Sequence, residues 1–590
     1  MRLDLIVRDA NIVTLDERRP AARSLGVLHG RVVGLDEEID GLRADRVLDA
    51  GGATVVPGFN DAHCHTTWYG MTLSQLDLSA ARSPEEVHAA VERHAHGLPP
   101  DAWVVGAGLQ NLAGGGRPHR EALDRAGGGR PVWLKHTSGH LCYVSSEVLR
   151  RAGALEPGFV APDGGVVARD ADGRPDGLLE ETAQSLVQDQ VLPHSSETVA
   201  DAVGAATRRY LAEGITSFTE AGVGGGWIGQ TPVELAAYQR ASDTGRLHAR
   251  AQVMIASDVL HPLDGAHPDD GITTGLDLGL RTGLGDDRLS VGPVKIFLDG
   301  SLLGRTAAVT EPFCGCGHGT GSGPGSGSRS VNGRGSGSGS GSDSGSGSGS
   351  GGGAQERTGY FQNDPEAMAS LVLAAHRAGW NVAAHAIGDR AVGLALDVYE
   401  RAQREHQRPG ALHRVEHAGM VRPDQLQRFA ALGVVPVPQH NFLPAFGDAM
   451  AANLGPERTG WTYRLRSFLD LGLTVPGSSD RPVAPGAPLP AMEAMVRRLT
   501  DSGSPFGPDE RVTAEAALRA WTVGSAHATG AAASKGRLRP GMLADFAVLD
   551  GDPLRTDTDR IGAIGVLATA VGGVASHDPH SLVTVPEETA

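Results

Sequence analysis

The sequence predicts an α/β protein, because short apolar runs alternate with longer amphipathic stretches through the middle of the chain. The apolar runs have the length of buried parallel strands, and the amphipathic stretches have the spacing of helices that bury one face. Repeated strand–helix units are typical of a parallel α/β barrel or of an open doubly wound sheet. The expected strands include 132–134, 215–218, 294–297, 382–384 and 434–437, and the expected helices include 84–94, 196–213, 364–378 and 391–406.

The two ends of the chain are rich in short apolar runs separated by turn residues, which is typical of strands. We therefore expect one small β domain built from both termini, with the long α/β domain between them. The expected strands lie at 5–7, 12–14, 24–27, 31–33, 536–538, 545–549 and 566–571. The expected boundaries are 1–56 with 536–577 for the small domain, 57–535 for the large domain and 578–590 for a tail.

One stretch of the large domain, 317–353, consists almost entirely of Gly and Ser. Such a segment has no side chains to bury and loses much conformational entropy on ordering. We expect a disordered insert that carries no chemistry and separates two parts of one domain.

Composition and charge exclude several classes of partner. The 590 residues include 52 Lys and Arg against 69 Asp and Glu, a net charge of −17, and nucleic acids and anionic membranes both require a basic face. Four Cys are too few for a disulfide scaffold. The first residues have no signal-peptide core, and no apolar run reaches the roughly 18 residues that span a bilayer. We expect a cytoplasmic protein that binds a small molecule, and the sequence leaves formation of a homo-oligomer open.

The strongest local signal for chemistry is the pair His63 and His65, which ends the apolar stretch that begins at Val55. Residues i and i+2 of an extended strand point to the same side, so both imidazoles can contact one metal ion. A His-x-His pair alone is common by chance. Its position after a strand and after a Pro-Gly pair strengthens the interpretation as a metal site.

Four further residues that can bind a metal follow other apolar runs: Lys295, His385, His417 and Asp480. Taken singly, each has a structural interpretation: a histidine can be a hydrogen-bonded core residue, and Asp480 can cap a helix. Lys295 can belong to an ion pair, because a buried Lys is costly unless it is neutralised, paired or modified. The collective pattern favours a metal centre, since imidazole nitrogens and carboxylate oxygens suit zinc and similar divalent ions.

The order His-x-His, Lys, His, His, Asp resembles the metal-dependent amidohydrolase superfamily. Longer phrases resemble amidohydrolase family 3, the branch that includes N-substituted formamide deformylases. The resemblance covers nearly the whole chain apart from the Gly/Ser segment. The matching phrases lie at 57–65, 138–140, 214–217, 294–301, 385–391, 414–417, 477–483 and 540–548.

The resemblance implies a fold and a set of metal ligands. The implied fold is a (β/α)8 TIM-like barrel with a small β-sandwich domain built from both termini. One or two divalent ions are expected, with zinc as the expected metal and a carbamylated Lys295 bridging two ions. The implied ligands are His63, His65, Lys295, His385, His417 and Asp480.

The resemblance also implies a catalytic role for Asp480, and the positions of other residues after apolar runs predict contacts with the reacting group and the substrate. A bound metal lowers the pKa of water to about 7 and so makes hydroxide available. Asp480 is expected to accept the proton and pass it to the leaving nitrogen. His140, which follows the run at 132–134, is expected to help hold the oxyanion. Arg305, Gln439 and His440 are expected to contact the substrate.

Three functions follow from this interpretation. The first is a metal-dependent hydrolase that acts on a non-peptide carbon–nitrogen bond of the N-substituted amide or formamide class. The alternative is a metal-dependent deaminase of a cyclic amidine, which a single-metal site with an unmodified Lys295 would favour. The third is a catalytically inactive barrel that binds a small ligand, which an absence of bound metal would favour.

Overall fold

The computed structural model describes most of the chain. The predicted Gly/Ser insert 317–353 and the predicted catalytic residue His140 lie outside the described residues. The described residues are 2–109, 112, 116–136, 141–162, 165–225, 228–265, 267, 270, 272–314 and 358–585.

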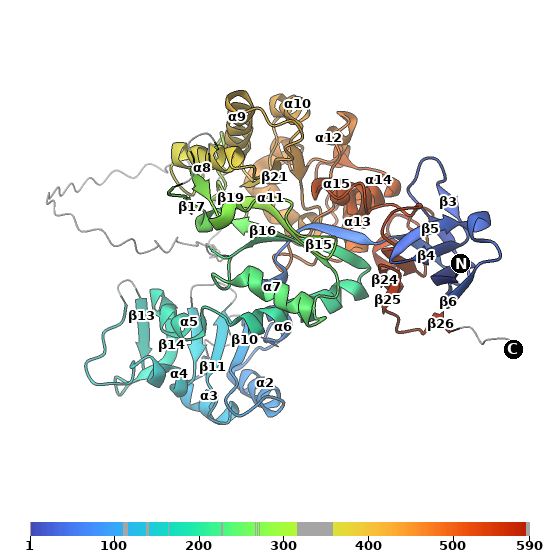
Figure 1. Ribbon diagram of the computed structural model, residues 1–590. Coiled ribbons are helices and arrows are strands. Elements are labelled where there is room, and N and C mark those ends of the chain that lie inside the picture. Colours follow the sequence, from blue (N-terminus) through green and yellow to red (C-terminus); the bar gives the residue numbers. More distant parts are fainter. Residues whose placement is uncertain are drawn as a thin grey trace.

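A parallel sheet that curls into a nearly closed barrel forms the centre of the molecule (Figure 1). Within the described residues it has seven strands in the order β22-β21-β20-β19-β16-β15-β8. Every residue of β8 and β15 is buried, as expected for parallel strands covered on both sides. The bounds are β8 Phe59–Cys64, β15 Ile215–Val223, β16 Arg250–Ala256, β19 Leu289–Phe297, β20 Val382–Ala386, β21 Arg414–His417 and β22 Val435–Val437.

Helices cover the outside of this barrel, and their starts follow local capping rules. In α8, for example, the Asp364 side chain accepts a hydrogen bond from the Ala367 N–H at 2.9 Å, and Pro365 stands at the first helical position. None of the helices in the described part of the chain combines the length and the apolar character needed to cross a bilayer. The main helices are α1 Thr66–Leu73, α6 Ser196–Ala212, α7 Glu234–Asp243, α8 Pro365–Arg377, α9 Asp389–Glu405, α10 Pro423–Leu432, α11 Phe442–Thr459, α12 Arg466–Asp470, α13 Pro488–Arg497, α14 Ala514–Arg519 and α15 Ser525–Ala528.

An irregular segment, 474–480, lies where an eighth barrel strand is expected. It runs beside β8, where the Ala62 N–H donates to the Gly477 carbonyl at 3.0 Å and the Asp480 N–H donates to the His63 carbonyl at 2.7 Å. Pro476 has no N–H, which prevents a regular ladder. At Gly477 a Cβ atom would lie only 2.5 Å from the Trp521 ring, so only glycine fits there. The expectation of eight regular strands is therefore corrected to seven strands and this segment.

A second, mixed sheet lies within the range expected to be barrel. Its order is β13-β14-β12-β11-β10-β9, and Figure 1 places it beside the barrel. The apolar run 132–134, expected to be a barrel strand, lies in this sheet instead, parallel to β10 and antiparallel to β12. The bounds are β9 Leu76–Asp77, β10 Val104–Leu109, β11 Val132–His136, β12 Leu141–Val144, β13 Gly165–Arg169 and β14 Pro175–Glu181, with helices α2 Pro84–His96, α3 Arg120–Ala126, α4 Ser146–Arg151 and α5 Ser185–Val191.

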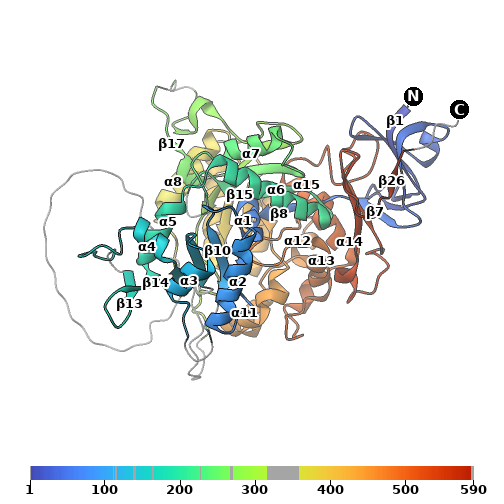
Figure 2. The same cartoon turned by 90° about the horizontal axis from the view of Figure 1, so that it is seen from below.

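Both ends of the chain contribute to two further sheets, and Figures 1 and 2 place the two termini on one side of the barrel. The sheets have the orders β26-β6-β1-β4-β5 and β25-β24-β23-β7-β2-β3 and share one apolar core. Their classification as a β-sandwich domain stays a prediction. The expected tail is corrected in part, because β26 pairs with β6. The bounds are β1 Arg2–Arg8, β2 Asn11–Val13, β3 Ala21–Ala22, β4 Leu25–Leu28, β5 Arg31–Leu35, β6 Arg43–Asp49, β7 Thr54–Pro57, β23 Phe546–Leu549, β24 Val566–Val571, β25 Val574–His577 and β26 Val583–Thr584.

Candidate metal centre

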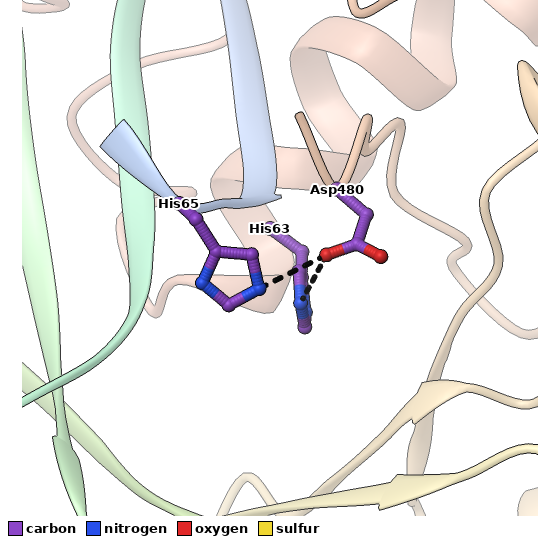
Figure 3. Close-up of side chains that lie close together, drawn as sticks. All are labelled: His63, His65 and Asp480. Atoms are coloured by element: carbon purple, nitrogen blue, oxygen red, sulfur yellow. Dashed lines mark ion pairs between the residues drawn. The ribbon is translucent and has the colours of Figure 1, made fainter. Parts of the chain in front are cut away.

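His63, His65 and Asp480 converge at the carboxyl end of β8 (Figure 3). Asp480 Oδ1 lies 3.3 Å from His63 Nε2 and 3.1 Å from His65 Nε2, and all three residues are buried. One ligand atom from each lies within 4.8 Å of the others. A single small cation can therefore contact all three side chains.

Two more of the predicted ligands extend this group along the same edge of the barrel. The ring centroids of His63 and His417 are 5.0 Å apart, and those of His417 and His385 are 4.4 Å apart. Both residues lie at the carboxyl ends of neighbouring strands, because β20 pairs with β21 in a register that places Ala386 opposite His417. The four histidines thus form a continuous row.

Lys295 lies on β19, the strand next to β20, with Phe297 opposite His385. Its Nζ atom is buried and has no hydrogen-bond partner in the described part of the structure, and it lies 4.7 Å from the centroid of the Phe297 ring. Burial lowers the pKa of Lys295 to about 8, although the carboxylates of Glu416 and Asp480 act in the opposite direction. All six predicted ligands therefore lie at one end of the barrel.

The atoms that face this centre fit a divalent cation. His63 Nε2 and Asp480 Oδ1, like Lys295 Nζ, are buried and lack a hydrogen-bond partner among the residues that the structure describes. Buried polar atoms in proteins normally have a hydrogen-bond partner, so buried atoms without one in this part of the barrel indicate a site for a bound species. Nitrogen and oxygen donors of these types suit zinc and similar ions.

The protonation states of the centre also suit metal binding. Burial lowers the pKa of His65, lowers that of His385 well below its usual range, and lowers that of His417 to about 3. Burial alone would raise the pKa of Asp480, but His63 and the neighbouring histidines hold it well below its usual range. At neutral pH the imidazoles of His65, His385 and His417 are therefore neutral and the Asp480 carboxylate is ionised, which are the forms that bind metals.

The backbone adopts uncommon conformations at two of these positions. His417 has φ = 68° and Asp480 has φ = 56°, in the left-handed region that residues other than glycine rarely occupy. Such residues persist only where the surrounding structure holds them, and they concentrate at functional sites. The positive φ angle changes the direction of the backbone at the end of β21 and at the end of segment 474–480, where these two side chains reach the centre.

Glu416 is a functional residue that the sequence analysis did not identify. It accepts a hydrogen bond from His63 Nδ1, and Arg414 donates to it through Nε at 2.7 Å and through Nη2 at 2.8 Å. Burial alone would raise the pKa of Glu416, but Arg414 and His63 hold it well below its usual range. The i, i+2 spacing of Arg414 and Glu416 on one strand was the signal available in the sequence.

Glu220, within β15, lies behind His65. One of its oxygens is 4.0 Å from His65 Nδ1, and the carboxyl group also accepts hydrogen bonds from the Thr67 N–H at 3.1 Å and from the Tyr238 hydroxyl. Burial raises the pKa of Glu220 to about 8, and the carboxyl group of Glu234 adds to this effect. Glu220 therefore packs against the side of His65 that faces away from Asp480.

The three predicted substrate-binding residues differ in their locations and in their hydrogen-bond partners. Gln439 and His440 are fully buried, and Gln439 accepts a hydrogen bond from His417 Nδ1 at 2.7 Å. Arg305, on the loop after β19, donates through Nε to Asn453 Oδ1 at 2.8 Å. The substrate-binding role of these three residues stays a prediction.

Comparison with known proteins matches almost the whole chain. A model of the amidohydrolase family matches residues 46–577. An N-substituted formamide deformylase from Arthrobacter pascens is 28% identical over 588 residues, which cover 98% of each chain. The protein LONG AFTER FAR-RED 3 from Arabidopsis thaliana is 28% identical over 581 residues, which cover 97% of this chain and 91% of that one.

A solved structure supports the fold. An uncharacterized metal-dependent hydrolase from Pyrococcus horikoshii superposes with a TM-score of 0.70 at 23% sequence identity. The superposition covers 94% of this chain and 99% of the other. The likeness therefore extends to the mixed sheet and the terminal sheets as well as to the barrel.

Proposed function

This chain belongs to the amidohydrolase family, and from that premise we propose that it is a metal-dependent hydrolase of the carbon–nitrogen bond in an N-substituted amide or formamide. The observation that carries the proposal is the convergence of His63, His65 and Asp480 at the carboxyl end of β8, where one ligand atom from each residue lies within 4.8 Å of the others. The likeness to an N-substituted formamide deformylase supports the substrate class. The substrate is a small molecule.

In this proposal His63, His65 and Asp480 hold one cation, and His385 and His417 contribute to a second. A divalent cation in this position supplies a Lewis acid that lowers the pKa of water and polarises a carbonyl group. The side chains contribute preorganisation: they lie on strand ends, and the backbone at His417 and Asp480 is held in an uncommon conformation.

Asp480 is proposed as the residue that moves the proton. Its Oδ1 atom lies at the centre, 3.3 Å from His63 Nε2 and 3.1 Å from His65 Nε2, so a water molecule that attacks the carbonyl carbon there can pass a proton to this carboxylate. A bond forms between the water oxygen and that carbon. As the carbon–nitrogen bond breaks, its electron pair stays on nitrogen, which takes the proton from Asp480. The products are a carboxylic acid, formic acid in the case of a formamide, and an amine.

Lys295 is proposed to react with carbon dioxide. Because burial lowers its pKa to about 8, a fraction of the amine is neutral and nucleophilic near neutral pH. The Nζ atom forms a bond to the carbon of carbon dioxide and loses a proton, and the resulting carbamate presents two oxygen atoms. The carbamate on Lys295 would give the two cations an anionic ligand, which the unmodified amine of Lys295 cannot provide.

The experiment that tests the function combines metal analysis with a substrate screen. Elemental analysis of the purified protein is expected to give one or two divalent ions per chain. Chelation is expected to abolish the release of amine from N-formyl and N-acyl amines, and zinc is expected to restore it. Full activity of metal-free protein would contradict the proposal. Release of ammonia from cyclic amidines, without hydrolysis of any N-substituted amide, would favour the deaminase alternative.

A further inference from the structure

Gln439, which follows β22, makes a complete set of hydrogen bonds beside His417. Its side-chain Nε2 donates to the Val437 carbonyl at 2.8 Å and to Ser478 Oγ at 3.0 Å, so the amide orientation is fixed. Its Oε1 atom then faces His417 Nδ1 at 2.7 Å. Because an amide oxygen can only accept, Nδ1 of His417 carries the hydrogen.

This arrangement determines which nitrogen of His417 is free to bind a metal. A neutral imidazole has one N–H group, and here it is on Nδ1, so Nε2 keeps its lone pair. We propose that Gln439 is a positioning residue that fixes the tautomer and the ring orientation of His417 for metal binding, and that it does not contact the substrate. The inference rests on the proposed function, because it assigns His417 to a cation.

Two observations favour positioning over substrate binding. Both N–H bonds of the Gln439 amide are directed to protein acceptors, and the residue is fully buried, so neither donor is available to a substrate. Gln439 also contacts the segment 474–480, which carries Asp480, because its Nε2 donates to Ser478 Oγ at 3.0 Å. Gln439 therefore connects the His417 ring to the segment that positions a second ligand.

His63 has a related arrangement, with Glu416 in the place of Gln439. The Nδ1 atom of His63 donates to the Glu416 carboxylate, and its Nε2 atom faces Asp480. Two rings of the centre thus present Nε2 and are held through Nδ1 by a buried acceptor. Residues behind a metal ligand that orient it typically contribute a factor of about 10 to 100 in metal affinity.

The test replaces Gln439 by Met, which keeps the length of the side chain and removes the acceptor. Gln439→Met is expected to bind cobalt or zinc about 10- to 100-fold more weakly, measured by competition with a chelating dye, and to lose the cobalt more rapidly to chelator. Gln439→Glu retains an acceptor for Nδ1 and is expected to restore most of the affinity. The visible absorption of the cobalt-loaded protein is expected to change in the Met variant, because the set of ligands changes.

Gln425 provides the matched control. It is also a buried glutamine, whose Oε1 accepts from the Arg422 N–H at 3.0 Å and whose Nε2 donates to the Asp389 carbonyl at 2.7 Å. Gln425→Met is expected to cost similar stability without a change in cation affinity. Ser478→Ala, which removes one anchor of the Gln439 amide, is a milder variant that is expected to weaken cation binding by a few-fold.

The outcomes separate this inference from the proposed function. A folded Gln439→Met protein that binds cations as tightly as the wild type, but with a raised KM, would show that Gln439 contacts substrate and would overturn the inference alone. Unchanged cation affinity in Ser478→Ala would also count against it. Wild-type protein that binds no divalent cation would overturn the proposed function and the inference together.

Discussion

Single residues of the centre obtain their chemistry from burial. Lys295 is the clearest case: in water its amine has an ordinary pKa of 10.5, and inside the barrel burial lowers the value to about 8. The buried Nζ atom has no hydrogen-bond partner among the described residues. Burying this amine as an ammonium ion costs free energy, and modification of the amine removes that cost. We therefore expect removal of the Lys295 side chain to affect metal binding more than folding.

Replacing Lys295 by Ala is expected to remove one cation per chain and most of the activity, with partial rescue by added short carboxylates, because these can take the place of the carbamate. Elemental analysis and an amine-release assay measure both effects. Lys535→Ala is the control, since burial also lowers the pKa of Lys535 to about 8 but it lies near Asp545, at the other end of the barrel. Two tightly bound ions in the Lys295 variant would contradict the bridging role.

Asp480→Asn is expected to lower kcat by about 10²- to 10⁴-fold, the usual contribution of a residue that moves a proton. An amide cannot accept the proton, although it retains an oxygen for the cation. Steady-state kinetics and metal analysis together measure the effect. Asp389→Asn is the control, because Asp389 is also a buried carboxylate, but its oxygens accept hydrogen bonds from the Thr310 N–H and from Arg422 and it is not a predicted ligand. Equal losses in the two variants would indicate a structural effect only.

Strands and helices of the barrel are connected by buried polar groups at both ends. At the carboxyl end, Asp299 accepts hydrogen bonds from the N–H groups of Ala308, Ile387 and Gly388 at 2.7–2.9 Å, which ties the loop after β19 to the end of β20. At the opposite end, Val382 N–H donates to His413 Nδ1 at 3.1 Å. These contacts hold neighbouring strands at a constant register.

His413 belongs to a chain of hydrogen bonds that requires neutral imidazoles. Since its Nδ1 accepts from Val382, its Nε2 must donate to His376 Nδ1 at 2.9 Å, and His376 Nε2 donates to the His406 carbonyl at 2.7 Å. Burial, assisted by His376 and Arg408, lowers the pKa of His413 to about 3 from an ordinary 6.5. Protonation of either ring would place two N–H groups face to face.

We expect the contribution of these hydrogen-bonded histidines to the free energy of unfolding to be complete above pH 6.5 and to be lost as the pH falls toward 3. In that range the unfolded state binds a proton at His413 that the folded state does not bind. The wild type is expected to lose unfolding free energy when the pH is lowered from about 7.5 to 5. The His413→Gln variant, which has no imidazole at this position, is expected to lose about 2 kcal/mol less over the same range. Urea unfolding at the two pH values measures it. A variant with the same pH dependence as the wild type would contradict the assignment.

At the scale of the whole molecule, a buried ion pair joins the terminal sheets to the barrel. Arg250, the first residue of β16, donates to Asp545 through Nε at 2.7 Å and Nη2 at 3.0 Å, and the Gly572 N–H donates to the same carboxylate at 2.7 Å. The side chains are only 11% and 4% exposed. A pair of this kind contributes little net stability when intact, but removing one partner leaves a buried charge.

Asp545→Asn is expected to destabilise the protein by about 3 kcal/mol, because it leaves Arg250 without its counter-charge. Asp49→Asn is the control: Asp49 pairs with Arg8 at 3.0 Å, but these side chains are 47% and 61% exposed, and such surface pairs contribute about 0–1 kcal/mol. Denaturant unfolding of the two variants compares the effects. Equal destabilisation of both variants would contradict the expected cost of leaving a buried Arg250 without Asp545.

The sequence predicted much of the fold because its evidence is local. The alternation of apolar runs and amphipathic stretches indicated the strands at 215–218, 294–297 and 382–384, and these lie in the barrel. The resemblance to the amidohydrolase family is confirmed by the match over 46–577. The run at 132–134 formed a strand but in another sheet, since an apolar run specifies a strand and not its partner.

By itself, the sequence determined the side chains that can bind a metal and their positions at strand ends, since strand periodicity and chemical type are properties of neighbouring residues. Only the tertiary structure decided which strands pair, how segment 474–480 fills the gap beside β8, and which residues stand behind the ligands. Glu416 and Gln439 show the difference, because each contacts a histidine of another strand: Glu416 contacts His63 of β8, and Gln439 contacts His417 of the neighbouring strand β21. Such contacts depend on how distant segments pack, so a spacing such as that of Arg414 and Glu416 can indicate a candidate residue but does not specify the histidine that it contacts.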